Sequence, residues 1–172
     1  MLERVASTDS PQPNLAVVRI GAAGVDLRTV RFAVVADRLA DPGNLGTILR
    51  SAEAAGAEVV ALTAESVDPF NPKVVRASAG ALFHVPVVEA TIAEVRAAGL
   101  RLLGTSSHEG TPHTDVDWSG RIAIAVGNET HGLAADTPVD EWVRIRHVGR
   151  AESLNVAMAA TVLCFEAARA RA

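Results

Sequence analysis

The chain has 172 residues, of which 49% are apolar and 21% are charged, a composition typical of one compact globular domain. Its 16 Lys and Arg residues and 20 Asp and Glu residues give a net charge of −4, which excludes a uniformly basic coat for nucleic acid. Cys164 has no second cysteine to pair with and lies in an apolar stretch. The sequence therefore predicts a buried, inert thiol and a reducing compartment, the cytoplasm.

The first 28 residues are rich in turn-forming Ser, Pro and Gly. We predict a linker or leader at residues 1–28 and a folded domain at residues 29–172. The leader contains acidic residues and no long apolar run, so we expect neither a secretory signal nor a membrane partner.

Five short apolar runs are predicted to be strands buried on both faces. They are Phe32–Ala36, Val59–Leu62, Val85–Val88, Leu100–Leu103 and Ile122–Val126. Three segments have helical spacing, and each begins with a residue suited to cap a helix: Asn44–Ala55, Thr91–Ala98 and Ser153–Arg171. Strands that alternate with helices predict an α/β fold, a parallel sheet with helices on both faces.

Common nucleotide and metal motifs are missing from the sequence. The residues after Ala36 contain no Gly-x-Gly-x-x-Gly, and Gly127–Gly132 is not followed by the Lys and Ser/Thr of a phosphate loop. The five histidines form no His-x-x-x-His pair and have no cysteine nearby. We therefore expect neither a nucleoside triphosphatase nor a metal site.

Three polar clusters interrupt the apolar pattern, at places where a parallel sheet presents its ligand crevice. They are Asp41–Gly56 (DPGNLGTILRSAEAAG), Ile124–Leu133 (IAVGNETHGL) and Ile145–Ala159 (IRHVGRAESLNVAMA). Together and in this order they resemble the three motifs of the SpoU (TrmH) family of RNA ribose 2′-O-methyltransferases, in the SPOUT superfamily. The resemblance extends from Phe32 to the C-terminus.

The resemblance implies a homodimeric domain whose C-terminal part forms a deep trefoil knot, with S-adenosylmethionine held in the knot and ribosomal or transfer RNA as substrate. The cofactor-binding residues that it implies are Thr105, Gly127, Ile145, Gly149, Ser153 and Leu154. The catalytic residues that it implies are Asn44, Arg50, Glu129 and Asn155. Many family members carry a separate RNA-recognition domain before the catalytic one, and residues 7–20 are similar to the linker that would follow it.

Arg50 is implied to lie at the reacting ribose. Because a free guanidinium stays protonated far above neutral pH, we expect Arg50 to remain cationic, to bind the ribose or a phosphate, and to stabilise the developing alkoxide. A phosphate oxygen, water or the cofactor carboxylate then takes the proton. Four arginines flank the motif ends and are expected to form a basic strip for RNA phosphates: Arg38, Arg144, Arg146 and Arg150.

Simpler interpretations remain open for each of these residues. Asn44 and Ser153 suit helix N-caps, Glu129 a loop surface, and Arg50 a solvated helix face. Two other functions also remain open: a catalytically weak RNA-binding or ribosome-assembly module that keeps the knot, and a knotted enzyme that methylates a base. A broad apolar stripe on the last helix favours a homodimer: Leu154, Met158, Val162 and Phe165.

Overall fold

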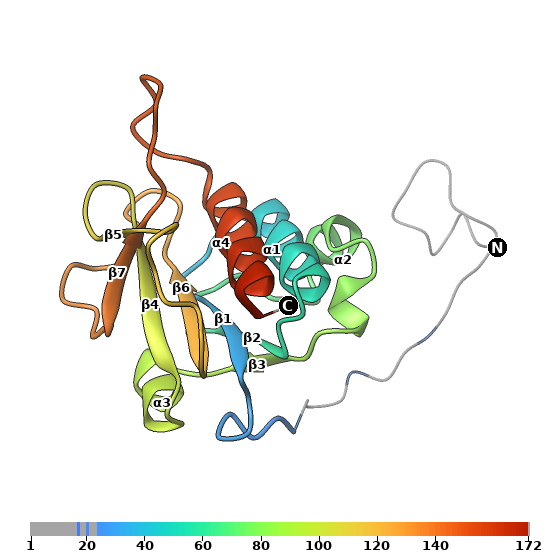
Figure 1. Ribbon diagram of the computed structural model, residues 1–172. Helices are drawn as coiled ribbons and strands as arrows, with labels where there is room; N and C mark the ends of the chain where they lie inside the picture. Colours follow the sequence, from blue (N-terminus) through green and yellow to red (C-terminus); the bar gives the residue numbers. More distant parts are fainter. Residues whose placement is uncertain (1–16, 18–19, 21–23, 172) are drawn as a thin grey trace.

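A parallel sheet forms the centre of the fold in this computed structural model, which describes Val17, Ile20 and residues 24–171 (Figure 1). Most of the predicted linker lies outside the described residues. The strands are β1 (Phe32–Ala36), β2 (Val59–Leu62), β3 (Val87–Glu89), β4 (Arg101–Ser106), β5 (Thr111–Pro112), β6 (Ile122–Val126) and β7 (Glu141–Arg144). In the described part of the chain these seven strands make one sheet in the order β3-β2-β1-β6-β4-β7-β5.

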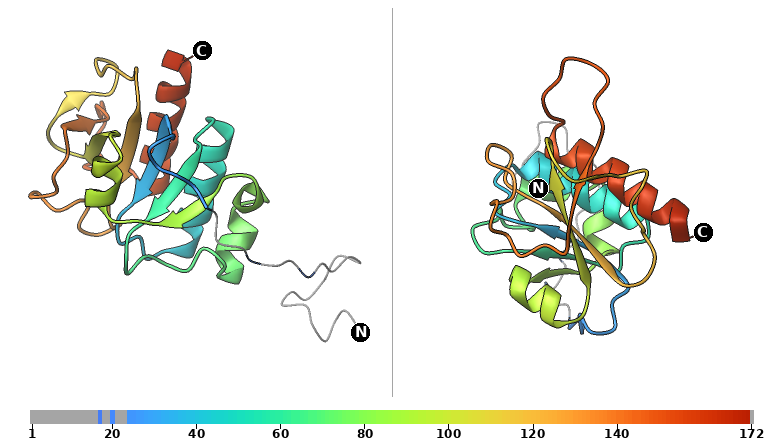
Figure 2. Two further views of the ribbon diagram at one scale, coloured as in Figure 1. Left: turned by 90° about the horizontal axis from the view of Figure 1, so that it is seen from below. Right: turned by 60° about the vertical axis from the view of Figure 1, so that its left-hand side comes forward.

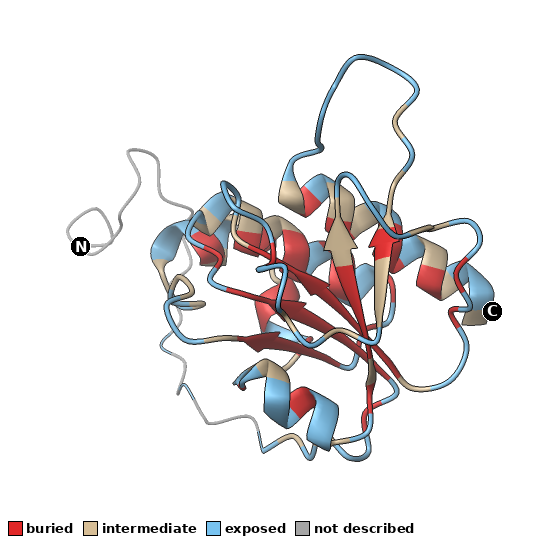
Figure 3. Ribbon diagram, turned by 90° about the vertical axis from the view of Figure 1, so that its left-hand side faces the viewer, coloured by how far each residue is buried: buried red, intermediate tan, exposed pale blue. Residues whose placement is uncertain are grey.

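Helices cover both faces of this sheet, as the sequence predicts. They are α1 (Pro42–Ala54), α2 (Pro72–Ala77), α3 (Ile92–Ala97) and α4 (Val156–Arg171), with a 3₁₀ turn η2 at Ala81–Phe83. Helix α1 packs against α2 and α4 on one face, whereas α3 lies on the other (Figures 1 and 3). The predicted parallel α/β architecture is therefore confirmed.

The side chains of each central strand divide between two cores. Along β1, Phe32 and Val34 belong to the cluster beneath α1 and α4, and Ala33 and Val35 belong to the cluster beneath α3. All five β1 residues are buried, as Figure 3 shows for the central strands. Burial on both faces explains why the central strands read as continuous apolar runs in the sequence.

Three elements were missing from the sequence prediction. Strand β7 (Glu-Trp-Val-Arg) has a charged residue at each end and buries only Val143, so it forms no continuous apolar run. Strand β5 has two residues and α2 has six, which is too short for a clear periodicity. The predicted strand at Val85–Val88 begins instead at Val87, since Pro86 has no N–H to donate to a neighbouring strand.

The segment from β7 to α4 leaves the carboxyl end of the sheet and stands away from the body of the molecule (Figures 1 and 2). Val148 in this segment is fully exposed. Helix α4 then returns to α1 and β6. The residues that the resemblance assigns to the third motif therefore come from an extended loop and the start of the helix that follows it.

Helix α4 buries Cys164 completely. Burial raises the pKa of the Cys164 thiol to about 12, which keeps it protonated and unreactive, as predicted. None of the described helices combines the length and the apolar character that a bilayer span needs.

Candidate functional site

A cavity of about 440 Å³ opens at the carboxyl ends of β4, β6 and β7. Its walls come from the loops after β4 and β6, the end of β7 and the first turns of α4. Five of the six predicted cofactor-binding residues line it: Thr105, Gly127, Ile145, Ser153 and Leu154. The sixth, Gly149, lies outside this cavity and lines a neighbouring depression.

The loop after β6 turns back on itself at Gly127. The amide of Gly132 donates to the Asn128 carbonyl oxygen at 2.8 Å, and Gly132 has a φ of +67°. A Cβ at position 127 would overlap the backbone of Gly132 and Leu133. Only glycine at position 127 therefore permits this close approach of two backbone segments at the cavity wall.

Glu129 accepts hydrogen bonds from residues at the start of the first motif. Its carboxylate accepts from the Asp41 amide at 2.8 Å, the Ala40 amide at 3.2 Å and Asn44 Nδ2 at 3.1 Å. Partial loss of solvent acts to raise the pKa of Glu129, but the hydrogen bonds outweigh it and the pKa lies below its usual 4.5. Glu129 is therefore an anion that fixes the 40–44 turn at the mouth of the cavity.

Asn44 joins this carboxylate to the third motif. Its Oδ1 accepts from Asn155 Nδ2 at 3.0 Å, across 111 positions of sequence. Asn155 in turn uses its own Oδ1 to accept from the amides of Ala157 (2.9 Å) and Met158 (3.2 Å). Three predicted catalytic residues, one from each motif, thus form a single hydrogen-bonded chain.

The predicted helix caps at Asn44 and Ser153 are wrong. Helix α1 begins earlier, with Asp41 as its N-cap accepting from the Asn44 amide at 2.8 Å. Helix α4 begins at Val156, and Asn155 caps its free amides. Because other residues satisfy these helix ends, the side chain of Asn44 can bind Glu129 and Ser153 can face the cavity.

Arg50 is the predicted catalytic residue that takes no part in these hydrogen bonds. It lies on the exposed side of α1, nearly two turns beyond Asn44, and it does not line the cavity. Its neighbours Leu49 and Ser51 are buried instead. Among the described residues Arg50 has no carboxylate within ion-pair distance, so none of them neutralises its charge.

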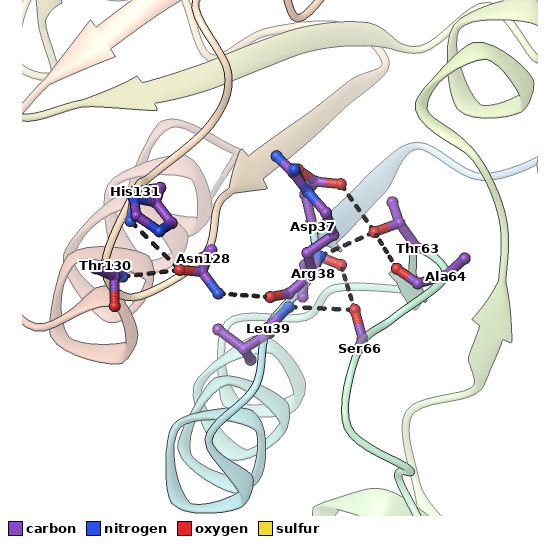
Figure 4. Close-up of polar contacts among 10 residues, drawn as sticks. Asp37, Arg38, Leu39, Thr63, Ala64, Ser66, Asn128, Thr130 and His131 are labelled. Atoms are coloured by element: carbon purple, nitrogen blue, oxygen red, sulfur yellow. Dashed lines mark hydrogen bonds and ion pairs between the residues drawn. The ribbon is translucent and has the colours of Figure 1, made fainter.

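A polar network beside the cavity holds the chain after β1 (Figure 4). Arg38 has a φ of +51°, which non-glycine residues rarely adopt. Thr63 Oγ1 accepts from the Arg38 amide at 2.9 Å and donates to Asp37 at 2.8 Å, and Asn128 Nδ2 donates to the Arg38 carbonyl oxygen at 3.0 Å. The Arg38 side chain is ion-paired with Asp37 at 3.1 Å. The Arg38 side chain is therefore already in an ion pair. The other arginines of the predicted basic strip form no ion pair with the described residues.

Several cavity residues were not identified from the sequence. The stretch Ser106–Glu109 lines the cavity and comes soon after the predicted strand at Leu100–Leu103. Its place after the carboxyl end of a strand could have identified it as part of a ligand site. Trp142 and Val143 belong to β7, which the sequence pattern did not reveal. His108, His131 and His147 also line the cavity, but the described residues contain no cluster of three or more metal-ligating side chains.

Replacing Glu129 by glutamine is expected to make the stability of the domain less dependent on pH in acid. Because its folded-state pKa is lowered, the carboxylate stabilises the fold fully above its usual pKa, and this contribution is lost as the pH falls through the folded-state pKa. Urea unfolding between about pH 5 and pH 3 measures this loss of stability. Glu152→Gln removes a carboxylate of the same cavity that accepts no hydrogen bond from the described residues, and it serves as the control. Equal pH slopes for wild type and Glu129→Gln would contradict the prediction.

The sequence of this chain is similar to those of known proteins. Residues 31–165 match the SpoU rRNA Methylase family. The chain is 37% identical over 169 residues to 23S rRNA (guanosine(2553)-2′-O)-methyltransferase RlmP of Bacillus subtilis, covering 94% of this chain and 66% of that protein. It is also 37% identical over 186 residues to the 23S rRNA (uridine(2479)-2′-O)-methyltransferase of Streptomyces viridochromogenes, covering 99% of this chain and 65% of that one.

Solved structures agree with these sequence matches. The AdoMet-bound rRNA methyltransferase of Sinorhizobium meliloti has a TM-score of 0.78 and 37% identity, over 84% of this chain and 60% of that one. The SpoU methyltransferase AviRb of Streptomyces viridochromogenes, in complex with AdoMet, has a TM-score of 0.75 and 40% identity, over 83% and 58%. The chain spans slightly less than two thirds of the length of these relatives. The match over residues 31–165, which contains all three motifs, shows that the chain belongs to the SpoU rRNA Methylase family.

Proposed function

We propose that residues 29–172 are the catalytic domain of an S-adenosylmethionine-dependent methyltransferase that acts on a ribose 2′-hydroxyl of RNA, with ribosomal RNA favoured over transfer RNA. The observation that carries the proposal is the hydrogen-bonded chain Glu129–Asn44–Asn155, which joins the three motifs beside a cavity that Glu129 lines. The two relatives named as 23S rRNA 2′-O-methyltransferases support the substrate class. The lone buried thiol suits a reducing cytoplasm.

The cavity fits S-adenosylmethionine in size and chemistry. Its volume of about 440 Å³ lies within the usual range of small-molecule sites, about 300–1,000 Å³. Ile145, Leu154 and Leu163 offer apolar contacts for a purine, while Thr105 and the backbone near Gly127 offer polar groups. The bound cofactor would supply an electrophilic methyl group on a sulfonium.

The residues of the chain would then orient and activate the ribose. Glu129, which lines the cavity, and Asn155 hold the side chain of Asn44 between them. Arg50 lies further along α1, and helical side chains lean toward the helix N-terminus, which for Arg50 is the direction of Asn44. A cationic Arg50 would bind the ribose or an adjacent phosphate and stabilise the alkoxide as the hydroxyl loses its proton.

We also propose the trefoil knot of the family for the C-terminal part. Support comes from β7, which lies between β4 and β5 although both precede it in sequence. From β7 the chain returns to α4, whose Arg171 donates to the Gly120 carbonyl oxygen at 2.6 Å in the connection between β5 and β6. The strand order and this contact place the C-terminal segment against parts of the chain that precede it in sequence, an arrangement that is compatible with the knot.

The protein is expected to bind S-adenosylmethionine without a metal ion, since the cavity offers the ligand backbone, hydroxyl and apolar groups. Isothermal titration of chelator-treated protein with S-adenosylmethionine measures this binding.

A catalytically weak binding module would also bind the cofactor, so methyl transfer is the test of function. The experiment measures tritiated methyl transfer to ribosomal RNA from a strain lacking the protein and maps the ribose methylation. Absence of transfer to any ribose would reject the proposed function.

A homodimer is expected, because α4 exposes a stripe of large apolar side chains. Met158 is 54% exposed, Phe165 49% and Val162 39%, all on one side of the helix. Light scattering at tens of micromolar should give twice the chain mass, and Met158→Glu with Phe165→Glu should give the monomer mass. Phe83→Glu changes an apolar residue that is even more exposed but lies away from α4, and it should leave the dimer intact. A monomeric wild type would contradict the expectation.

A further inference from the structure

A second depression adjoins the cavity at the carboxyl end of β7. Six polar side chains line it: Ser107, His108, Arg144, Arg146, His147 and Glu152. Gly149 and Ala151 line it as well and fill little of its space. Ser107, His108, His147 and Glu152 also line the cavity, so the two hollows share a wall.

The two arginines of this depression have no ion pair with any described residue. In the part of the chain that the structure describes, arginine ion pairs with carboxylates involve Arg28, Arg38, Arg96, Arg101 and Arg169. Arg144 and Arg146 have no carboxylate within ion-pair distance, although Glu152 lines the same depression. The Nε of Arg144 is buried and has no hydrogen-bond partner among the described residues. Burying such a donor is costly unless a ligand accepts its hydrogen bond.

This set of donors suits a phosphate group. Guanidinium groups bind phosphate through paired N–H donors, and imidazole N–H and serine hydroxyl groups add single donors. A carboxylate is present only at the boundary with the cavity, where Glu152 lines both hollows. With two arginines and one carboxylate in its lining, the depression carries a net positive charge.

We propose that this depression holds a backbone phosphate of the RNA substrate, next to the nucleotide whose ribose lies at the cavity mouth. The inference rests on the proposed function for the identity of the nucleic acid. It assigns Arg144 and Arg146 to one phosphate subsite, in place of a continuous strip with Arg38, which is already paired with Asp37. These contacts position the strand without reading its sequence.

The test measures binding of a short fluorescent single-stranded RNA by anisotropy over a range of KCl concentrations. Arg146 is exposed, so Arg146→Gln should fold normally. Its RNA affinity should fall about 10-fold, and the slope of log K against log salt should decrease in magnitude by about 0.7, the value for one phosphate contact to a single strand. Arg144→Gln should change both quantities in the same direction. Arg76→Gln, an exposed arginine on α2 far from β7, should leave both quantities as in wild type (Figure 1).

The outcomes separate this proposal from the proposed function. An unchanged salt slope in both Arg144→Gln and Arg146→Gln, or no RNA binding by wild type at low salt, would overturn the phosphate subsite. If wild type methylates RNA and the slopes are unchanged, the function stands and the subsite falls. If wild type transfers no methyl group but Arg146→Gln still lowers the slope, the subsite stands and the methyltransferase function falls. Calorimetry with S-adenosylmethionine should give equal affinities for wild type and Arg146→Gln, which shows that the cavity is intact.

Discussion

Replacing Arg50 by alanine is expected to lower RNA methyl transfer by about 10²–10³-fold, the usual loss when one group that stabilises developing negative charge is removed. Affinity for S-adenosylmethionine should stay within about twofold of wild type, because Arg50 does not line the cavity. Single-turnover transfer of a tritiated methyl group to ribosomal RNA, together with calorimetry, measures the two quantities.

Two further variants separate catalysis from simple surface charge. Arg50→Lys keeps the charge but loses the paired donors of the guanidinium, so it should restore little of the lost rate. Arg76→Ala removes another exposed helical arginine and should keep the wild-type rate. If Arg50→Ala transfers methyl groups at nearly the wild-type rate, Arg50 is a solvated surface residue and Glu129 and Asn155 become the next candidates.

Replacing Gly127 by alanine is expected to weaken S-adenosylmethionine binding by about 5–150-fold. A Cβ at this position overlaps the backbone of Gly132 and Leu133, and backbone cannot rotate away as a flexible side chain can. The loop after β6 must shift, and overpacking of this kind commonly costs about 1–3 kcal/mol, which corresponds to the expected loss of affinity.

Thermal unfolding and calorimetry together check this prediction. Gly24→Ala is the matched control, because a Cβ there meets no atom within 4 Å and its backbone is not left-handed. Circular dichroism establishes that Gly127→Ala is folded at the temperature of the titration. A folded Gly127→Ala protein with wild-type affinity for S-adenosylmethionine would show that this close backbone approach does not shape the cofactor site.

The sequence by itself determined the central strands and the helix that follows β3. The predicted runs at Phe32–Ala36, Val59–Leu62 and Ile122–Val126 coincide with β1, β2 and β6. Thr91 caps α3 as predicted, and it forms a capping box with Glu94. These features depend on neighbours within a few positions, or on burial of every residue in a run, and both leave a visible pattern in the order of residues.

The three motifs could also be recognised from the sequence, but not how their side chains meet. Glu129 lies 85 positions from Asn44, and Asn44 lies 111 positions from Asn155. Local rules assigned Asn44 and Ser153 to helix caps. In the structure Asp41 and Asn155 occupy the caps, which releases Asn44 for Glu129.

Only the tertiary structure decided the position of β7, the walls of the cavity and the exposure of Arg50. Strand β7 has one buried residue, so its pairing between β4 and β5 depends on backbone hydrogen bonds that leave little trace in residue type. The cavity and the depression beside it both border this strand. Side chains from distant segments converge there because parallel strands bring their carboxyl ends to one edge of the sheet. Which segments meet depends on the order of the strands in the sheet, and no local sequence pattern encodes that order.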